Sequence, residues 1–297
     1  MARIQATLIT DPGCPWAYSA EPSIHALRWR YGDQLGWRIV LIGLAESGEQ
    51  YEERGYGPAL MALASIRFGR FGMPFATAPR TRLVGTGRAC RAIVAARLID
   101  PELGRLALRA LHLAWFNTDL LLDEDAALVR ALGRVEGLDA VAAVARIDDP
   151  EVEEAYQRDR SEARSAAGSA ASLQGKTERV GGPERYTAPT LVLERDGTRL
   201  VGGGHQPLDA YDVLVANLDP TLRCESPPEG PLPLLERFPY GLTTREVSAM
   251  LAPRNELPDD AGALAALVGL VAEGRATREP LGDDALWRPA QAPRPPG

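Results

Sequence analysis

Alternating apolar and polar positions predict two strands near the start of the chain. Residues 3–10 (RIQATLIT) are rich in β-branched side chains and are apolar at alternate positions, which is typical of a half-buried strand. Residues 35–42 (LGWRIVLI) alternate in the same way. We therefore expect two strands here, joined by the segment that separates them.

The joining segment predicts a turn followed by a kinked helix. Residues 11–13 (Asp-Pro-Gly) are turn formers, and Pro15 suits the first helical position, where its missing N–H costs nothing. We expect the helix to run to Tyr31. Pro22 lies inside it and should kink it near the preceding residue, because proline removes one helical hydrogen bond.

A helical period replaces the alternation in the middle of the chain. Apolar residues recur at i, i+3 and i+4 in five segments, which are 58–71, 87–99, 101–115, 123–133 and 149–173. Glycines and a proline at 181–183 end this block. Residues 189–193 and 199–201 then predict a hairpin, since Asp196-Gly197 is a strong turn signal between them. A helix at 207–217 follows.

The C-terminal quarter has a pattern of its own. Residues 223–237 are rich in proline, glycine and glutamate and indicate a linker. Helices are predicted at 242–251 and 259–273, and a hairpin at 277–287. Because helix, helix and hairpin is the outline of a winged helix, we assign residues 238–290 to a winged-helix-like domain. Residues 291–297 are expected to form a loose tail.

Composition and charge narrow the possible functions. The 297 residues carry a net charge of −7, which disfavours general binding to nucleic acid or to an anionic membrane. No apolar run approaches the ~20 residues needed to span a bilayer, and the N-terminus lacks the features of a signal peptide, so we expect a cytoplasmic protein. The three cysteines and three histidines show no metal-ligand spacing, and no metal is expected.

Three motifs resemble one family. Residues 11–18 (DPGCPWAY) are similar to the D-P-x-C-P-W-C-Y motif of the DsbA family, especially its cytosolic FrnE-like branch, and Ala17 is the departure. Residues 186–193 (YTAPTLVL) resemble the strand that carries the family's cis-proline, and 203–208 (GGHQPL) resemble the turn before its last helix. The resemblance covers roughly residues 3–218.

The resemblance implies an α/β fold of the thioredoxin-like type with a large inserted helical domain. The thioredoxin-like domain would comprise residues 1–57 and 181–222, and the insertion residues 58–180. Cys14 would be the catalytic residue. Pro15, Trp16, Ala17, Ala188 and Pro189 would form the substrate-binding surface, with a cis bond before Pro189.

Cys14 precedes the predicted helix, where free N–H groups and the helix dipole favour a thiolate. We therefore expect a pKa below the usual value near 8.5. Because Ala17 replaces the second cysteine, release of a mixed disulfide would need an external thiol such as glutathione or mycothiol. No tightly bound cofactor is expected. The partner would be a small thiol or a protein disulfide.

Each of the other candidate residues can have either a structural or a functional role. Cys90 lies in a predicted helix and is expected to be a core thiol, whereas Cys224 at the start of the linker could be exposed and act as a remote resolving thiol. His25 is expected to be a packed or surface residue. His205 could act as a base near the sheet edge.

Three alternatives stay open. Related kappa-class glutathione transferases and 2-hydroxychromene-2-carboxylate isomerases use a serine at the position of Cys14, so a similar enzyme for a small hydrophobic substrate is one. A catalytically degenerate binding or scaffold protein is another. A DNA-binding redox sensor is the third and is disfavoured, because residues 239–288 carry more acidic than basic side chains. A homodimer through the C-terminal unit fits that charge better.

Overall fold

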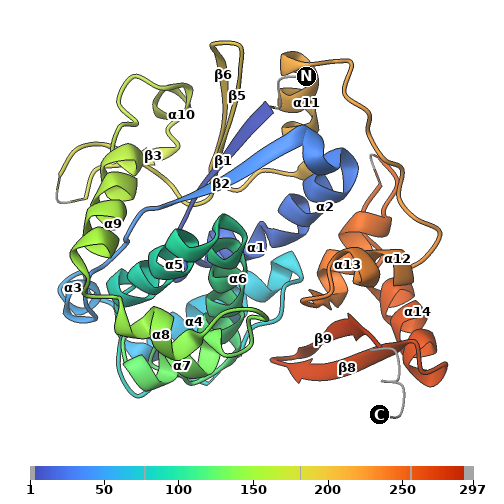
Figure 1. The fold of residues 1–297 in the computed structure, drawn as a ribbon, viewed down its shortest axis with the longest axis horizontal. Coiled ribbons are helices and arrows are strands. Elements are labelled where there is room, and N and C mark those ends of the chain that lie inside the picture. Colours follow the sequence, from blue (N-terminus) through green and yellow to red (C-terminus); the bar gives the residue numbers. More distant parts are fainter. Residues whose placement is uncertain (1–3, 77, 181, 255, 291–297) are drawn as a thin grey trace.

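The computed structural model describes residues 4–76, 78–180, 182–254 and 256–290. Its centre is a four-stranded sheet in the order β2-β1-β5-β6 (Figure 1). β1 (Ile4–Thr10) pairs in parallel with β2 (Leu35–Leu41), from Ile4 opposite Leu35 to Thr10 opposite Leu41. β5 (Thr190–Arg195) is antiparallel to both β1 and β6 (Thr198–Gly203). The α/β class and the thioredoxin-like order of elements are confirmed.

The segment between β1 and β2 forms two helices rather than one bent helix. α1 (Pro15–Ser19) and α2 (Glu21–Tyr31) meet at Ala20, one residue before the predicted position of the kink. Pro22 lies in the first turn of α2, where its missing N–H costs nothing. A short 3₁₀ turn, Gly32–Gln34, leads into β2.

The central helical block lies beside one part of the sheet. Its helices are α3 (Glu49–Glu52), α4 (Pro58–Phe68), α5 (Gly87–Ile99), α6 (Pro101–Asn117), α7 (Asp125–Leu132), α8 (Ala140–Ala145), α9 (Pro150–Ala163) and α10 (Ala170–Leu173). A 3₁₀ turn, Gly69–Phe71, follows α4. The single helix predicted at 149–173 is wrong. The chain leaves α9 at Arg164 and passes through Gly168, whose positive φ of 73° a helix cannot accommodate.

Short elements complete the first 220 residues. β3 (Thr177–Glu178) and β4 (Arg185–Tyr186) form a two-stranded sheet just before β5. α11 (Leu208–Leu218) follows β6 and corresponds to the helix predicted at 207–217. No helix in the described ranges is long and apolar enough to cross a membrane.

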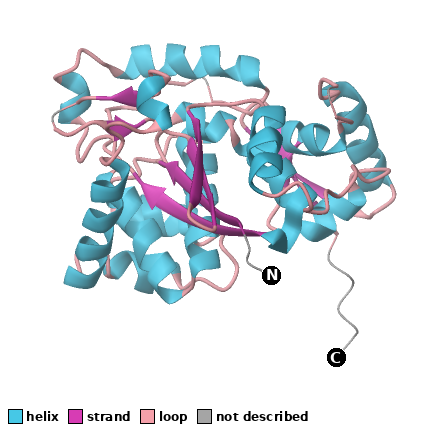
Figure 2. Ribbon diagram, turned by 90° about the horizontal axis from the view of Figure 1, so that it is seen from above, coloured by secondary structure: helices cyan, strands magenta, loops and turns pink. Residues whose placement is uncertain are grey.

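The C-terminal part packs against α2 and α6 instead of standing apart. It contains α12 (Leu232–Arg237), β7 (Leu242–Thr243), α13 (Thr244–Leu251), α14 (Asp260–Ala272), β8 (Ala276–Leu281) and β9 (Asp284–Pro289), with its strands in the order β7-β9-β8. Figure 2 shows this part beside the four-stranded sheet. Its assignment as a winged-helix domain, and all the domain boundaries, stay predictions.

The end of the expected linker is helical. Residues 232–237 form α12 because Leu234 and Leu235 are fully buried in the core of the C-terminal part, which outweighs the proline-rich composition. The predicted hairpin corresponds to β8 and β9. The predicted tail at 291–297 lies outside the described residues.

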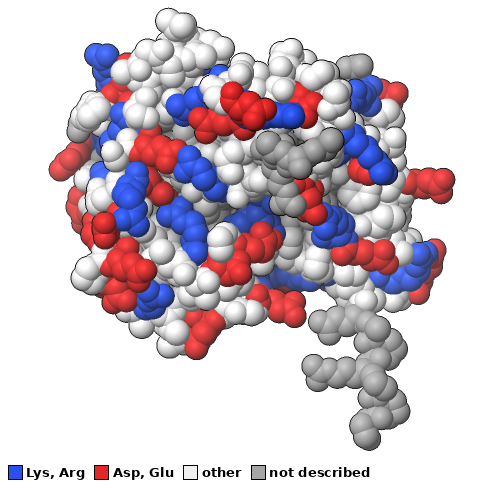
Figure 3. All heavy atoms as spheres, turned by 45° about the horizontal axis from the view of Figure 1, so that its top comes forward, with Lys and Arg blue, Asp and Glu red and all other residues white. Residues whose placement is uncertain are grey.

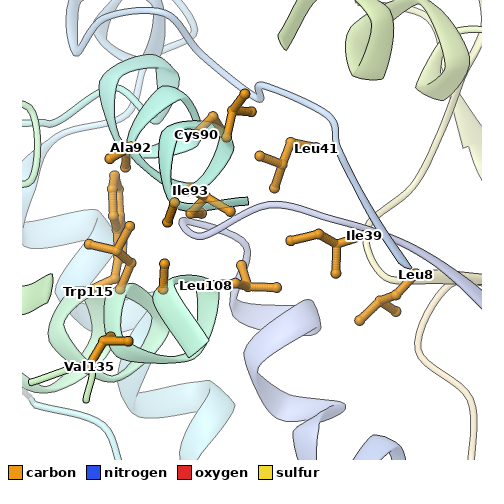
Figure 4. Packing of buried hydrophobic residues seen from close by; sticks show 14 of the residues in the cluster. Leu8, Ile39, Leu41, Cys90, Ala92, Ile93, Leu108, Trp115 and Val135 are labelled. Carbon is orange, nitrogen blue, oxygen red and sulfur yellow. The ribbon is translucent and has the colours of Figure 1, made fainter. Parts of the chain in front are cut away.

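One apolar cluster joins the sheet to the helical block. Leu8 of β1 and Ile39 and Leu41 of β2 pack toward α5 and α6, as the close view in Figure 4 shows. Leu108 and Trp115 contribute from α6. A second cluster packs Ala26 of α2 against the core of the C-terminal part. The C-terminal part therefore shares a core with the thioredoxin-like region.

The described surface mixes both signs of charge. On the face that Figure 3 displays, Lys and Arg lie among Asp and Glu. Many arginines are paired with acids, for example Arg82 with Asp123 and Arg88 with Asp125. On this face the interspersed charges form no basic stripe of the kind that nucleic-acid binding uses.

Candidate active site

Cys14 and Ala188 meet although 174 residues separate them. Cys14 is the residue before α1, and its thiol donates a hydrogen bond to the Ala188 carbonyl, with an Sγ–O distance of 3.3 Å. The Ala188–Pro189 peptide bond is cis, as the resemblance implies. The structure therefore brings Cys14, Ala17, Ala188 and Pro189 to one place, where β1, α1 and the start of β5 converge.

The expected low pKa of Cys14 is wrong. The residue is only 6% exposed, and burial, with a further contribution from the Asp11 carboxylate, raises the pKa of its thiol to about 12. The backbone N–H groups of Ala17 and Trp16 and the charge of Arg185 favour the thiolate but do not outweigh these effects. α1 has only five residues, so little helix dipole is available to offset the loss of solvent.

Asp11 is the buried acid beside this cysteine. Its carboxylate accepts hydrogen bonds from the N–H groups of Gly13 and Leu44, both at 2.9 Å, and from Thr86 Oγ1 at 3.2 Å. Burial nevertheless raises the pKa of Asp11 above its ordinary value. The sequence indicated only a turn at this position. Thr86, which lies at the start of α5, was missed because nothing in its local sequence marks it.

Gly13 allows the loop before Cys14 to lie close to the helical block. A Cβ atom on Gly13 would lie 2.5 Å from Thr86 Cγ2, which is closer than carbon atoms can pack, and 3.0 Å from Trp115 Cζ2, which is also tighter than usual. A glycine is therefore required between Asp11 and Cys14 by the approach of α5 and α6. The loop that carries the cysteine is clamped by tertiary contacts.

The other two cysteines differ in where they lie: Cys90 is a core thiol whose Sγ lies 3.7 Å from Asp11 Oδ2, and Cys224 is too far from Cys14 to resolve a disulfide on it. Cys90 is fully buried, and burial and Asp11 raise its pKa well above the usual value, so the expectation of a core thiol is confirmed. Cys224 is half-buried and adjoins Glu225, whose N–H donates to the Arg30 carbonyl at the far end of α2. An eleven-residue helix spans about 16 Å, whereas a disulfide needs Cα atoms within about 7 Å.

Trp16 anchors an aromatic surface beside the site. It is 41% exposed, and its ring contacts those of Phe68, Phe71 and His205 at centroid distances of 4.8, 5.3 and 5.8 Å. His205 therefore packs in an aromatic cluster, and burial lowers its pKa. Such a surface suits an apolar peptide or small molecule.

A basic cavity adjoins the cysteine on another side. It has a volume of about 240 Å³, and its lining includes four arginines, Arg54, Arg160, Arg164 and Arg185, together with Glu46 and Glu53. Burial and the like charges of Arg160 and Arg185 lower the pKa of Arg164. Leu44 connects the two places, because it lines the cavity and packs in the cluster that contains Cys14. A small anion bound here would relieve the repulsion between the arginines.

A buried polar network leads from the loop to the C-terminal part. The Asp11 carbonyl contacts His112 Nε2 at 3.1 Å, and His112 Nδ1 contacts Glu21 Oε1 at 3.2 Å. His25 and Glu246 continue the network on α2 and α13.

Glu21, His25 and Glu246 have the donor set of a metal site. However, Arg109 donates to both oxygens of Glu246. We therefore describe the cluster as an ion-pair network, since that carboxylate is already neutralised.

Comparisons with known proteins support the fold. No protein-family model matches the sequence, and no curated protein matches it. Cytosolic disulfide reductase DsbM from Pseudomonas aeruginosa superposes with a TM-score of 0.52 at 20% identity, covering 72% of this chain and 98% of that one. Its structure with GSH gives 0.51 at 21% identity, over 72% and 98% of the two chains. The probable DsbA oxidoreductase from Streptomyces coelicolor gives 0.52 at 17%, covering 76% and 100%. The structural neighbours are thus DsbA-like and DsbM-like proteins, and this chain has their thioredoxin-type fold.

Proposed function

We propose that this protein is a thiol–disulfide oxidoreductase or thiol transferase that works through Cys14 alone, with a low-molecular-weight thiol as cosubstrate. The observation that carries the proposal is the contact between Cys14 Sγ and the Ala188 carbonyl, next to cis-Pro189. This contact places the thiol against the backbone of the cis-proline loop, with which a bound peptide or thiol would pair once it reaches the buried Ala188 carbonyl. The neighbours' oxidoreductase activity supports the same chemistry.

The reaction is an exchange without net oxidation of the protein. Cys14, once deprotonated, attacks one sulfur of a disulfide RSSR, forms the mixed disulfide Cys14–S–SR and releases RS⁻, which takes up the proton. An external thiolate then attacks the sulfur of R, and Cys14 leaves and is reprotonated. Since Ala17 offers no thiol, the second step needs the external partner.

The raised pKa of Cys14 favours one direction of this chemistry. A strongly oxidising disulfide depends on a stabilised cysteine thiolate in the reduced protein. Burial of Cys14 does the opposite, so a disulfide on Cys14 should be a weak oxidant of other proteins and should be released by the external thiol. We therefore assign the protein to reduction or thiol transfer, with slow attack by Cys14. The cytoplasm, where small thiols are abundant, fits this assignment.

The basic cavity supports an acidic thiol as cosubstrate. Glutathione carries two carboxylates, and arginine is the side chain best suited to bind them. Arg160 has a buried Nε without a hydrogen-bond partner among the described residues. Arg164 follows the last residue of α9 and lines the same cavity, and Arg185 lies close enough to Cys14 to favour its thiolate. The structure of DsbM with GSH is consistent with this choice.

Mass spectrometry of the intact protein tests the proposal. After incubation with oxidised glutathione, we expect one glutathione adduct, located on Cys14 and removed by free glutathione. Cys14→Ser should lose the adduct, whereas Cys224→Ser should keep it. Arg164→Gln should slow adduct formation, and Arg158→Gln, on the exposed side of the same helix, should not. An adduct confined to Cys224 would refute the proposal.

The protonated state of Cys14 favours one alternative. A thiol with a pKa of about 12 is a hydrogen-bond donor at neutral pH, and it could hold a cosubstrate thiolate in the way a serine does in kappa-class transferases and the isomerases related to them. Trp16 and its aromatic neighbours would then bind a small hydrophobic substrate. Cys14→Ser would retain activity under this alternative and lose it under the main proposal.

A further inference from the structure

A second and larger cavity lies between the helical block and the C-terminal part. Its volume is about 610 Å³, which is within the range of ~300–1,000 Å³ that small-molecule sites occupy. One wall comes from α6 and α7, and the other from residues 239–240 and the β8–β9 hairpin. Cys14, Ala17, Ala188 and Pro189 do not line it, so it is separate from the candidate active site.

The inner wall of this cavity is mainly apolar. Leu106, Ala110 and Leu113 line it along one side of α6, and Leu281 and Leu286 line it from the hairpin. Their spacing on α6 is that of one helical face. An apolar molecule that covered these side chains would remove them from water, which favours binding.

Arginines provide most of the charge around the cavity. Arg134 and Arg288 share one carboxylate, that of Glu279, with N–O distances of 2.5 and 2.7 Å. Arg130 has no acidic partner among the described residues. Arg109 also lines the cavity, but Glu246 neutralises it. Two acids, Asp119 and Glu136, line the cavity as well.

We propose that this cavity binds a small amphipathic acid, which is a molecule with an apolar chain or ring and one carboxylate. The apolar part would lie along α6, and the carboxylate would bind Arg130 and the Arg134–Arg288 pair, which a single glutamate leaves incompletely neutralised. A carboxylate is chosen because arginine binds it through two parallel hydrogen bonds.

Binding would also stabilise the contact between the two parts of the chain. A ligand that binds only when both walls are in place stabilises the folded protein in proportion to the logarithm of its concentration.

Calorimetric titration of the full chain with decanoate tests this proposal, with decyltrimethylammonium as the probe of opposite charge and both below micelle-forming concentrations. We expect one decanoate per chain and at least tenfold weaker binding of the cation. Arg130→Gln should weaken decanoate binding roughly fivefold, as expected for a partly exposed ion pair. Arg158→Gln, at an exposed arginine of α9 that does not line this cavity, should leave decanoate binding unchanged.

Ala110→Trp should fill the cavity and abolish binding, and its circular dichroism must match that of the parent protein. Should that variant fail to fold, Arg130→Gln still decides the outcome. The proposal would be overturned if decanoate and decyltrimethylammonium bound equally well. It would also be overturned if Arg130→Gln or Ala110→Trp bound decanoate as tightly as the parent protein does. Cys14→Ser should bind decanoate normally, so failure of the thiol chemistry and failure of this site are distinguishable.

Discussion

Glu246 in α13 and Arg109 in α6 form a doubly hydrogen-bonded ion pair in the interior, with N–O distances of 2.6 and 2.8 Å. The second Arg109 nitrogen also donates to the Gly241 carbonyl at 2.7 Å. Glu246 in addition closes a capping box with Thr243 at the start of α13. One buried pair thus fixes the C-terminal part to the helical block.

Glu246→Gln should destabilise the protein strongly. Burial alone would raise the pKa of Glu246, but Arg109 and His25 hold it below its ordinary value, so the group is charged at neutral pH. The variant leaves the Arg109 charge buried without a counter-charge, which costs about 3–5 kcal/mol. Urea unfolding measures the effect. As a control, Glu229→Gln at an exposed position should change the free energy of unfolding by less than ~0.5 kcal/mol. If the two variants had equal effects, the Arg109–Glu246 pair would not have this stabilising role.

Acidification should lower the free energy of unfolding, because His25 is buried in its neutral form. Its Nδ1 lies 3.0 Å from the Glu21 carbonyl and its Nε2 lies 3.1 Å from the Tyr240 hydroxyl, an arrangement that the neutral ring with its proton on Nδ1 satisfies. Burial, together with Arg109 and against the pull of Glu246 and Glu21, lowers the pKa of His25 from 6.5 to about 4.

Because the unfolded chain takes up this proton first, His25 contributes stability that is complete above pH 6.5 and is lost as the pH falls toward 4. The loss should approach about 3 kcal/mol. Urea unfolding at pH 7 and at pH 4.5 measures it. In His25→Gln this part of the pH dependence should be absent, and an unchanged pH dependence would show that His25 is not its source.

Cys14 should react slowly with an alkylating reagent at neutral pH. With its thiol buried and its pKa raised to about 12, iodoacetamide should label the half-buried Cys224 first, and the rate at Cys14 should keep rising beyond pH 10. Peptide mapping by mass spectrometry separates the two sites, with Cys14→Ser as the control. Preferential labelling of Cys14 at pH 7 would mean that the loop opens and exposes a thiolate.

Ala17→Cys should remove the need for an external thiol. Residues 14 and 17 lie three apart at the start of a helix, where side chains adjoin, and the backbone N–H of residue 17 already faces the Cys14 sulfur. After reaction with oxidised glutathione, the variant should release a second glutathione and hold a 14–17 disulfide. The parent protein and Ala17→Ser should keep the adduct. Spontaneous release by the parent protein would contradict the single-cysteine mechanism.

Local sequence determined the elements around the site. The Asp-Pro-Gly turn, Pro15 at the start of α1 and the hairpin turn at Asp196-Gly197 each act over a few residues, so pattern and turn chemistry predicted them. The absence of a cysteine at position 17 is equally a property of the sequence, and it limits the chemistry whatever the fold. The likeness of residues 186–193 to a known strand further indicated the cis bond before Pro189.

Tertiary structure decided how these residues behave. Whether the Cys14 thiol ionises depends on its burial and on Asp11, and a helix terminus alone predicted the wrong direction. Thr86 beside Asp11 and Arg109 beside Glu246 are separated by 75 and 137 residues, so no local pattern could pair them. Electrostatic energies depend on distance and on exclusion of water, and both are set only when the helical block and the C-terminal part close around the loop that carries Cys14.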